Sequence, residues 1–343
     1  MKRLNNTLYV TNPEAWLSLD GETILVQKGE ETLGRVPLIN LDGVVCFGYR
    51  GASPALMGAC TERGIDLSFL TPHGRFLSRV AGPVRGNVLL RKAQYEWSAR
   101  PERALPLARM FLTGKIVNAR WRLERAKRDH PQRVDAEAVR AAAEEMRSAL
   151  SLLGAADSIE SLMGLEGIAA KAYFGAFNQT ILRGESAFRF DGRSRRPPMD
   201  RVNALLSFAY SLLTGEIAGA LEGVGLDPYV GFLHQLRPGR MSLALDLLEE
   251  LRAPVADRFA VTQINLGVVA AEDFSQKENG AFYLKDDARK RFLSAWQKFK
   301  QEPLTHPFLK EKIQWGLVPH AQALLLARHI RGDLDAYPPF FWK

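Results

Sequence analysis

Residues 231–252 read GFLHQLRPGRMSLALDLLEELR and combine a histidine, a glycine-containing turn and a leucine-rich segment that carries acids. The leucines predict an amphipathic helix, and Ser242 is suited to be its N-cap. Asp246 and Glu249 are three residues apart, so both carboxylates lie on one face of that helix. With His234 from the preceding loop they predict a mixed nitrogen and oxygen site for a divalent ion, and they place that site in a helical part of the chain.

A further protein ligand is expected from Glu166. It lies in residues 162–174, LMGLEGIAAKAYF, which predict a helix of mostly apolar or small side chains. Residues one turn before and after Glu166 are apolar, so we expect its carboxylate to point inward, where a metal or another cation must balance the charge. Gly164 and Gly167 lower helix propensity, which indicates a close approach of another backbone or of a substrate.

Each of these side chains also has an ordinary structural interpretation. His234 could be a core histidine with satisfied hydrogen bonds, and the acids could lie on a solvated helix face. The surrounding leucines argue that at least one acid lies near the apolar side, and Glu250 is the acid expected to face solvent. Asn203 could cap a helix, and Tyr210 could be a half-buried aromatic.

The chain predicts an α+β protein with a small N-terminal β-sandwich domain followed by a large, all-helical catalytic domain. Residues 15–19 and 23–27 flank Asp-Gly-Glu, and residues 65–70 and 76–80 flank Pro-His-Gly-Arg, so both pairs predict hairpins. Helical periodicity begins after Arg85. We therefore expect a β-sandwich domain at 1–84, a linker at 85–104 and a helical domain at 105–343. Helices are expected near 105–128, 135–153, 158–182, 200–222, 242–271, 285–300 and 318–331, and the aromatic tail at 337–342 is expected to pack as a strap on the helical domain.

Composition limits the class of protein. The 343 residues carry a net charge of +8, which favours a polyanionic partner without proving one. The two cysteines, Cys46 and Cys60, form no Cys-x-x-Cys pair, so neither a disulfide framework nor a thiolate zinc site is indicated. No signal peptide and no long uncharged apolar stretch is evident, so we expect a cytoplasmic protein without a membrane partner.

Basic residues gather in two regions. The first runs along the start of the helical domain and includes Arg109, Lys115, Arg120, Arg122, Arg125, Lys127 and Arg128. It could neutralise phosphates or be a solvated helix face with internal salt bridges. The second is an exposed loop whose arginines could contact a nucleic-acid backbone. The candidate nucleic-acid contacts are Arg189, Arg193, Arg195, Arg196, Arg201, Arg240 and Arg252.

In their order and spacing these segments resemble the CRISPR-associated adaptation integrase family, the universal endonuclease and integrase subunit of spacer acquisition. The resemblance spans essentially the whole chain. It rests on the 72–76 hairpin, on Leu90-Arg91-Lys92-Ala93-Gln94, on Leu165-Glu166-Gly167, on the segment 202–210 and on the 234–252 block. The Arg-Pro-Gly-Arg turn and the Asp-Leu-Leu-Glu-Glu helix look most like the type I-C branch.

The resemblance implies that Glu166, His234 and Glu249 are metal ligands for Mg²⁺ or Mn²⁺, with Asp246, Asn203 and Tyr210 in support. Many family members have Asp at the position of Glu249, so the ligand role could instead pass to Asp246. The implied reaction is attack by a prespacer 3′-hydroxyl on phosphodiesters at the boundaries of a CRISPR repeat. The implied partners are double-stranded DNA, a second copy of the chain that dimerises through the β-sandwich domain at 1–84, and a small ferredoxin-like adaptation protein.

Two other functions are consistent with the same residues. A general metal-dependent nuclease acting on branched DNA in repair would have the same site but no preference for a repeat. A non-catalytic DNA-binding scaffold would use the basic surfaces alone and would bind DNA without metal.

Overall fold

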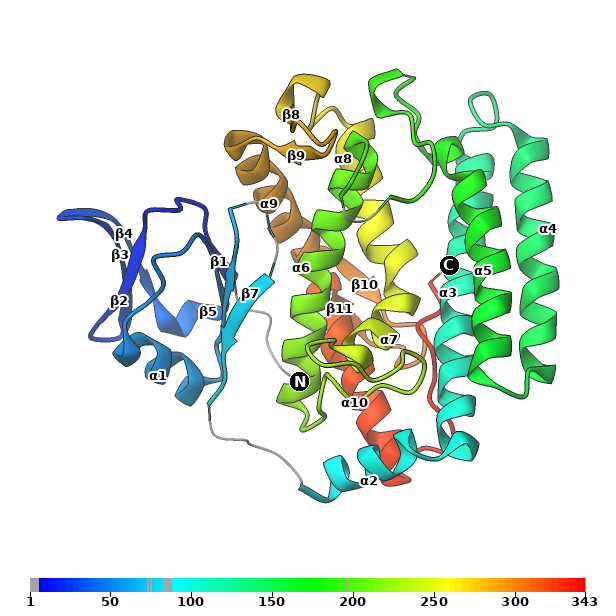
Figure 1. Cartoon of the computed structure of the whole chain (residues 1–343), viewed down its shortest axis with the longest axis horizontal. Coiled ribbons are helices and arrows are strands. Elements are labelled where there is room, and N and C mark those ends of the chain that lie inside the picture. Colours follow the sequence, from blue (N-terminus) through cyan, green and yellow to red (C-terminus); the bar gives the residue numbers. More distant parts are fainter. Residues whose placement is uncertain are drawn as a thin grey trace. The chain divides into compact units, whose positions relative to one another are not determined.

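The computed structural model describes residues 6–72, 74, 76–82, 88–184, 186–194 and 197–342. Strand sheets precede a largely helical region, which confirms the predicted fold class (Figure 1). The chain divides into two compact units, the first comprising Met1–Arg85 with Leu284–Glu302, and the second Gly86–Tyr283 with Pro303–Lys343. Among the candidate residues, Arg195 and Arg196 lie outside the described residues, as do His73 and Arg75 of the second hairpin loop.

The first unit contains two sheets. One has the strand order β1-β5-β6-β7, in which β1, β5 and β6 run parallel and β7 is antiparallel to β6. The other is an antiparallel meander, β2-β3-β4. The strands are β1 (Asn6–Val10), β2 (Trp16–Asp20), β3 (Thr23–Lys28), β4 (Glu31–Pro37), β5 (Leu41–Phe47), β6 (Asp66–Leu70) and β7 (Phe76–Val80), with η1 (Leu38–Asn40) and α1 (Pro54–Arg63) between them. Both predicted hairpins are present as β2-β3 and β6-β7.

The two sheets share one hydrophobic core. Leu17 and Ile24 of the meander, Val44 and Leu67 of the mixed sheet, and Leu56 of α1 are all buried in it. Alternating apolar residues on each strand explain this, because one face of each sheet must leave water. The two cysteines of the chain are buried and free.

Helix α9 (Asp286–Gln301) belongs to the first unit. Its Arg289 donates a hydrogen bond to the Pro72 carbonyl, and Lys300 Nζ donates to Thr7 Oγ1 at 3.1 Å. The sequence-based boundaries placed this segment in a helical domain at 105–343, and the compact units differ from that assignment. Periodicity identifies a helix, but it does not tell which distant part of the chain the helix packs against.

The second unit is mainly helical. Its helices are α2 (Val88–Ser98), α3 (Pro101–Asp129), α4 (Ala136–Leu152), α5 (Ile159–Gly175), α6 (Arg201–Gly223), α7 (Ser242–Leu251), α8 (Arg258–Asn265) and α10 (Val318–Arg331). Shorter elements are η2 (Leu153–Ala155), η3 (Phe177–Thr180), η4 (Ser186–Phe188), the π-helical η5 (Arg252–Asp257), η6 (Ala271–Asp273) and η7 (Trp315–Leu317), with the strand pairs β8 (Phe274–Gln276) and β9 (Phe282–Leu284), and β10 (Pro303–Thr305) and β11 (Lys312–Gln314). In Figure 1, α3, α4 and α5 lie side by side, and α7 packs against both α3 and α6.

The long helix predicted at 242–271 is interrupted. It consists of α7, the π-helical turn η5 and α8, and Pro254 lies within η5. Proline has no backbone N–H and clashes with the preceding turn, so a regular α-helical ladder cannot pass through this position. The predicted cap also differs, because Met241 is the N-cap of α7 and the Ser242 hydroxyl donates to the Gln235 carbonyl at 3.1 Å.

Helix α2 lies within the range that the sequence predicted as a linker, 85–104, of which residues 85–87 are outside the described residues. Gln94 is fully buried, and its amide nitrogen donates to the carbonyls of Asp227 and Val230 at 2.8 and 2.7 Å. Its amide oxygen accepts from the Asp227 N–H at 2.9 Å. Helix α2 therefore anchors the loop that leads to His234.

Helix α6 is the one described helix that is long and apolar enough to cross a membrane by length and composition, and 61% of its most apolar window is buried inside the protein. Val202, Leu205 and Leu206 on α6 have no exposed surface. This burial is typical of the central helix of a folded core, which passes the same test.

Candidate active site

Asp246 on α7 organises the loop that carries His234. Its carboxylate is fully buried and accepts the backbone N–H groups of Phe232, Leu233 and His234 at 2.6, 3.0 and 2.9 Å. The Nδ1 atom of the His234 ring also lies 2.7 Å from Asp246 Oδ1. An ionised carboxylate that receives several such donors is well stabilised away from water. Asp246 thereby fixes both the loop and the orientation of the imidazole.

Gly231 allows this close approach. A Cβ atom at this position would lie 2.7 Å from Asp246 Oδ2 and 2.8 Å from the carbonyl carbon of Ser242. Real side chains do not make such short contacts, so only glycine lets the loop reach the helix here. The glycine next to the Phe232-Leu233-His234 run is thus required by the packing of the loop on α7.

Glu249 lies one helical turn after Asp246 and is surrounded by cations. Its Oε2 atom is 2.6 Å from Lys115 Nζ, and its Oε1 atom is 3.0 Å from Arg252 Nη2 and 3.9 Å from His234 Nε2. Burial raises the pKa of Glu249, but the positive charges of Arg252 and Lys115 outweigh burial and lower the pKa to about 2. Glu249 is therefore an ionised carboxylate in a nearly dry environment.

Glu166 reaches the same place from α5. Its carboxylate forms an ion pair with Lys115, which projects from α3, and the side chains of the pair are 19% and 14% exposed. The inward orientation expected from the sequence is thus observed, with a cation as partner. Gly164 and Gly167 have open space where a Cβ would lie, so no other backbone approaches them. The packing within the structure gives no reason for these two glycines.

Glu166, His234 and Glu249 are brought together, but Lys115 lies between the two glutamates. Among the residues that the structure describes, no group of three or more His, Cys, Asp or Glu side chains has the spacing of a metal-binding cluster. The donor chemistry still fits a divalent ion, because two carboxylates and an imidazole suit Mg²⁺ or Mn²⁺. In addition, Glu249 Oε2 is buried and has no hydrogen bond of good geometry, although Lys115 lies within ion-pair distance.

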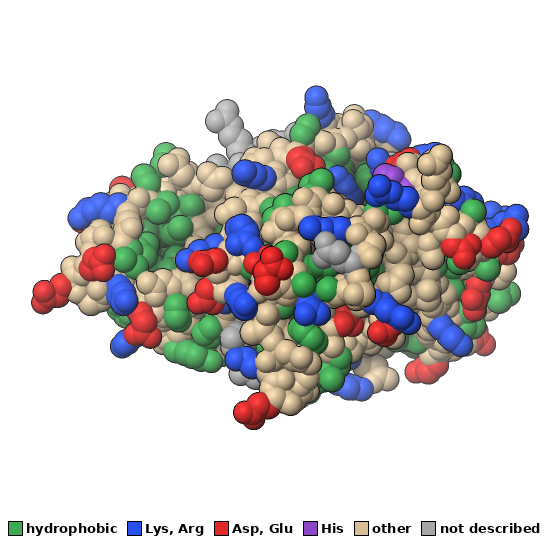
Figure 2. Space-filling model, turned by 90° about the horizontal axis from the view of Figure 1, so that it is seen from above, with side chains coloured by type: hydrophobic (Ala, Val, Ile, Leu, Met, Phe, Trp, Pro, Cys, Tyr) green, Lys and Arg blue, Asp and Glu red, His purple; other side chains and the backbone are tan. Residues whose placement is uncertain are grey.

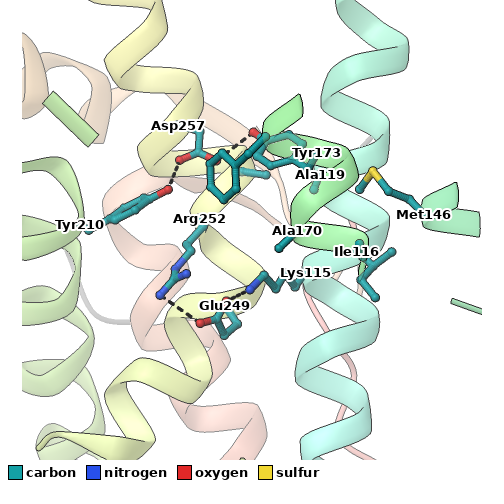
Figure 3. Close-up of a pocket in the computed structure, with 13 residues that line it drawn as sticks. Lys115, Ile116, Ala119, Met146, Ala170, Tyr173, Tyr210, Glu249, Arg252 and Asp257 are labelled. Atoms are coloured by element: carbon teal, nitrogen blue, oxygen red, sulfur yellow. Dashed lines mark hydrogen bonds and ion pairs between the residues drawn. The ribbon is translucent and has the colours of Figure 1, made fainter. Parts of the chain in front are cut away.

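Behind the glutamates lies a buried cluster of two tyrosines and an aspartate. Tyr210 donates to Asp257 Oδ1 at 2.5 Å and Tyr173 donates to Oδ2 at 2.8 Å. Burial raises the pKa of both phenols. Burial also raises the pKa of Asp257, and the positive charge of Arg122 opposes part of that increase. Figure 3 shows Arg252 between Tyr210 and Glu249. Tyr210 therefore contacts the glutamate cluster through Arg252.

Asn203 lies in a different part of the second unit. Its side chain is fully buried, accepts from Arg193 Nη1 at 2.6 Å and donates to the carbonyl of Gly192 at 2.8 Å. Asp200, not Asn203, is the N-cap of α6. The guanidinium that Asn203 holds lies 5.2 Å from the ring centre of Tyr210. Asn203 is thus connected to the glutamate cluster through Arg193, Tyr210 and Arg252.

The arginines proposed as nucleic-acid contacts lie in different environments. Arg252 is buried against Glu249, and Arg201 donates to the carbonyls of Ala271 and Ala187 and stacks on Phe282. Arg189 is exposed and pairs with Asp191, while Arg240 is partly exposed in the turn before α7. Basic and acidic side chains are interspersed on the face drawn in Figure 2. The geometry thus gives Arg201 and Arg252 internal partners and leaves Arg189 and Arg240 near the surface.

The basic residues of α3 also separate into distinct groups. Arg109 donates to the carbonyls of Leu153 and Ala156, and Arg122 is buried near Asp257. Arg120 pairs with Glu124 one turn away, as expected for a salt-bridged helix face. The stripe read from the sequence is therefore not one continuous surface.

Glu250 corrects the sequence-based expectation. It was expected to face solvent, yet it is fully buried and accepts hydrogen bonds from Tyr337, Gln322 and the Phe340 N–H at 2.5, 2.8 and 3.0 Å. The aromatic tail packs on the helical unit as the predicted strap, with Tyr337 and Phe340 buried. The aromatic tail covers the face of α7 that carries Glu250, which the sequence predicted to be exposed to solvent.

Sequence reasoning did not assign Lys115, Tyr173 and Asp257 to the site. A signal for Lys115 exists, because Phe111, Leu112 and Ala119 lie one turn away on α3 and are buried. A lysine framed by apolar neighbours on a helix faces the interior and needs an acidic partner there. For Asp257 the signal is weaker, since it follows Pro254 in a turn whose helical type was not predicted.

Comparison with known proteins gives a consistent family. The model of the family described as "CRISPR associated protein Cas1" matches residues 8–298. A protein of Chlorobaculum tepidum named CRISPR-associated endonuclease Cas1 1 is 50% identical over 343 residues, which is 100% of both chains. A Rhodospirillum rubrum protein named CRISPR-associated endonuclease Cas1 2 is 51% identical over 347 residues, again with 100% of both chains covered.

Solved structures share the fold at lower sequence identity. A casposase bound to integration product has a TM-score of 0.84 at 22% identity and is covered to 94%, with 98% of this chain. A Cas1 protein from Thermotoga maritima has a TM-score of 0.83 at 20% identity and is covered to 98%, with 96% of this chain. A chain of a Cas6-RT-Cas1–Cas2 complex has a TM-score of 0.80 at 23% identity, and this chain aligns over its full length to 36% of that chain.

Proposed function

Because the chain belongs to the Cas1 family of CRISPR-associated proteins, we propose that it is a metal-dependent DNA endonuclease and integrase of spacer acquisition. In the proposed reaction a prespacer 3′-hydroxyl attacks a phosphodiester at a repeat boundary, and one ester is exchanged for another without a nucleotide cofactor. The observation that supports this most is the convergence of Glu166, His234 and Glu249 from α5, a loop and α7.

We propose that Glu166, His234 and Glu249 would hold Mg²⁺ or Mn²⁺. When bound, the divalent ion supplies charge stabilisation for the phosphate oxygens as the ester is exchanged. Glu249 is suited to this role because its pKa of about 2 keeps it ionised at any working pH. Asp246 is suited to a supporting role instead, because its oxygens already accept three backbone N–H groups and face the His234 ring.

The neighbouring groups position the ligands. The Asp246 carboxylate orients the His234 ring so that Nε2 faces Glu249, a common arrangement for metal-binding histidines. Arg252 stacks on Tyr210 and pairs with Glu249 Oε1, so Tyr210 and Asp257 set the direction of that pair. Asn203 extends this support by holding Arg193 against Tyr210. We assign these residues to positioning and none of them to contact with the reacting atoms.

The proposed partners are double-stranded DNA, a second copy of this chain through the β-sandwich unit, and a small ferredoxin-like protein. DNA as a partner is supported by the structural similarity to a casposase bound to integration product. A second Cas protein as a partner is supported by the similarity to a chain of the Cas6-RT-Cas1–Cas2 complex. Arg189 and Arg240 are the described arginines we propose for phosphate contacts, with Arg195 and Arg196 from the same stretch of sequence as Arg189. Arg193 has internal partners in Asn203, Ser207 and Tyr210. We further propose a cytoplasmic location and membership of the type I-C branch.

The test is a joining assay with purified protein, the small partner and a labelled prespacer. The proposal predicts joined product on a supercoiled plasmid that carries a repeat, in Mg²⁺ or Mn²⁺ but not in EDTA, and much less product on a plasmid without the repeat. Equal cleavage of branched DNA without repeat preference would favour a repair nuclease. Metal-independent binding without any joining would favour a scaffold.

A further inference from the structure

Lys115 lies at the centre of the cluster that the proposed metal would enter. Its ammonium pairs with Glu166 on one side and lies 2.6 Å from Glu249 Oε2 on the other. The side chain comes from α3, whereas its two partners come from α5 and α7. Figure 3 shows Lys115 directed at Glu249, on the opposite side of that carboxylate from Arg252. One ammonium group thus joins three helices at a single point.

The charges explain why a cation is needed there. Glu166 and Glu249 approach the same point from two helices, and Asp246 adds a third carboxylate on α7. Two carboxylates that share one ammonium in a partly buried site repel each other strongly, because the local dielectric constant is lower than that of water. The two oxygens of Glu249 have different partners. Oε1 faces Arg252 and His234, whereas Oε2 faces Lys115. An ion that used Glu166 and Glu249 together would need the position that the ammonium holds.

The Lys115 side chain lies beside a small cavity and is partly exposed. A cavity of about 20 Å³ adjoins the side chain and is lined by Lys115, Ala170, Tyr173, Tyr210, Glu249 and Asp257 among others. This volume is sufficient for one water molecule. The ammonium can leave toward solvent while α3 stays in place, because the Lys115 side chain is 14% exposed and lysine has a flexible stem that carries a compact charge.

We propose that Lys115 is a built-in competitor for the divalent ion, holding Glu166 and Glu249 together in the metal-free protein and leaving its position when the ion binds. The inference rests on the proposed metal site and adds a residue that regulates it. Lys115 would hold the two carboxylates together before the ion binds, and it would weaken the affinity for the ion, because the ion must displace the ammonium from both of them. Lys115 acts as a positioning residue, because it does not contact the reacting atoms in this account.

The test measures metal binding and thermal stability, not activity. Lys115→Gln removes the charge and keeps a polar side chain of similar reach. We expect it to bind Mn²⁺ about tenfold more tightly by calorimetry or electron paramagnetic resonance, which is the effect of about one charge-pair interaction. We also expect a lower melting temperature in EDTA and a larger rise on adding Mn²⁺ than in the wild type. Lys115→Arg keeps the charge and should retain the wild-type affinity.

Lys171→Gln is the matched control, because Lys171 is exposed on α5, the helix that carries Glu166. It should leave both readouts unchanged. If Lys115→Gln does not fold in EDTA, the proposal predicts that Mn²⁺ restores the fold, and failure to do so would overturn it. Unchanged or weaker Mn²⁺ binding by a folded Lys115→Gln protein would also overturn it.

Glu166→Ala tests the proposed metal site separately from the competition by Lys115. Glu166→Ala should abolish Mn²⁺ binding if that site exists. If wild-type protein binds no Mn²⁺ that Glu166→Ala removes, then the metal site and the competition by Lys115 both fall. If the wild-type protein binds Mn²⁺ through Glu166 and Lys115→Gln binds it equally well, only the competition falls.

Discussion

Asp246 and His234 are joined at two points. The Asp246 carboxylate accepts the His234 backbone N–H at 2.9 Å, and its Oδ1 atom lies 2.7 Å from Nδ1 of the His234 ring. The same carboxylate also accepts the N–H groups of Phe232 and Leu233. The imidazole therefore cannot rotate without breaking contacts that also hold the loop. The position of His234 Nε2 relative to Glu249 follows from this arrangement.

Asp246→Asn is expected to disturb orientation without removing a metal ligand. An amide nitrogen cannot accept the backbone N–H groups, so the loop and the imidazole lose part of their support. Mn²⁺ affinity and strand transfer should fall by about 10- to 100-fold, as for other groups that orient a histidine ligand. Glu249→Gln should lower Mn²⁺ affinity and strand transfer further than Asp246→Asn does. Asp335→Asn is the control, because Asp335 is exposed, and it should change neither quantity. Equal losses of Mn²⁺ affinity in Asp246→Asn and Glu249→Gln would mean that the two acids share the ligand role.

Gly231→Ala is expected to reduce strand transfer while leaving the fold intact. The new Cβ would lie 2.7 Å from Asp246 Oδ2, so the loop must move away from α7 and take His234 with it. Gly164→Ala is the matched control, because a Cβ there meets nothing within 4 Å. That change should stabilise α5 by about 0.5–1 kcal/mol. Full activity of Gly231→Ala in the joining assay would show that the loop tolerates displacement.

Tyr337→Phe is expected to destabilise the second unit through Glu250. The phenol donates to Glu250 Oε1 at 2.5 Å and also accepts from Gln322 at 2.7 Å, so its removal leaves two buried polar groups short of a partner. The free energy of unfolding should fall by about 1–3 kcal/mol, measured by urea denaturation. Tyr229→Phe removes a hydroxyl from a tyrosine that is 40% exposed and should change stability little. Similar losses in both variants would contradict the role of the strap.

Glu250 should make stability depend on pH. Burial raises its pKa from 4.5 to about 7, although hydrogen bonds from Tyr337 and Gln322 oppose the increase. The folded protein then binds the proton more tightly than the unfolded chain, so this contribution is complete below about pH 4.5 and is lost as pH rises through about 7. Relative to Glu250→Gln, the wild type should lose a few kcal/mol of unfolding free energy across that window. Parallel stability curves for the two proteins would refute the assignment.

The sequence predicted the local part of the site well. The spacing of Asp246 and Glu249 on α7 fixes which acids share a face, because helical periodicity is a property of neighbouring residues. The hairpins of the first unit were likewise predicted from turn residues. The interruption at Pro254 was not, since periodicity continues through a π-helical turn and only the strict geometry of proline marks it.

The rest of the site depends on distant packing. Glu250 was expected to face water because the leucines around Asp246 and Glu249 placed those acids nearer the apolar side, but the tail residue Tyr337, 87 positions away, covers Glu250. Lys115 was read as one member of a basic stripe, yet it pairs with Glu166, 51 positions away on another helix. Nothing in the local pattern around either residue indicates which helix will lie opposite. Tertiary packing decides such pairs.

Glu166, His234 and Glu249 are the side chains that we propose to carry DNA strand transfer. The most direct measurement compares wild-type protein with Glu166→Ala and His234→Ala in joining a labelled prespacer to a repeat-containing plasmid with Mn²⁺, with DNA binding measured in parallel. Both variants should bind DNA as the wild type does and should form no joined product. Joining by either variant at the wild-type rate would contradict the proposal.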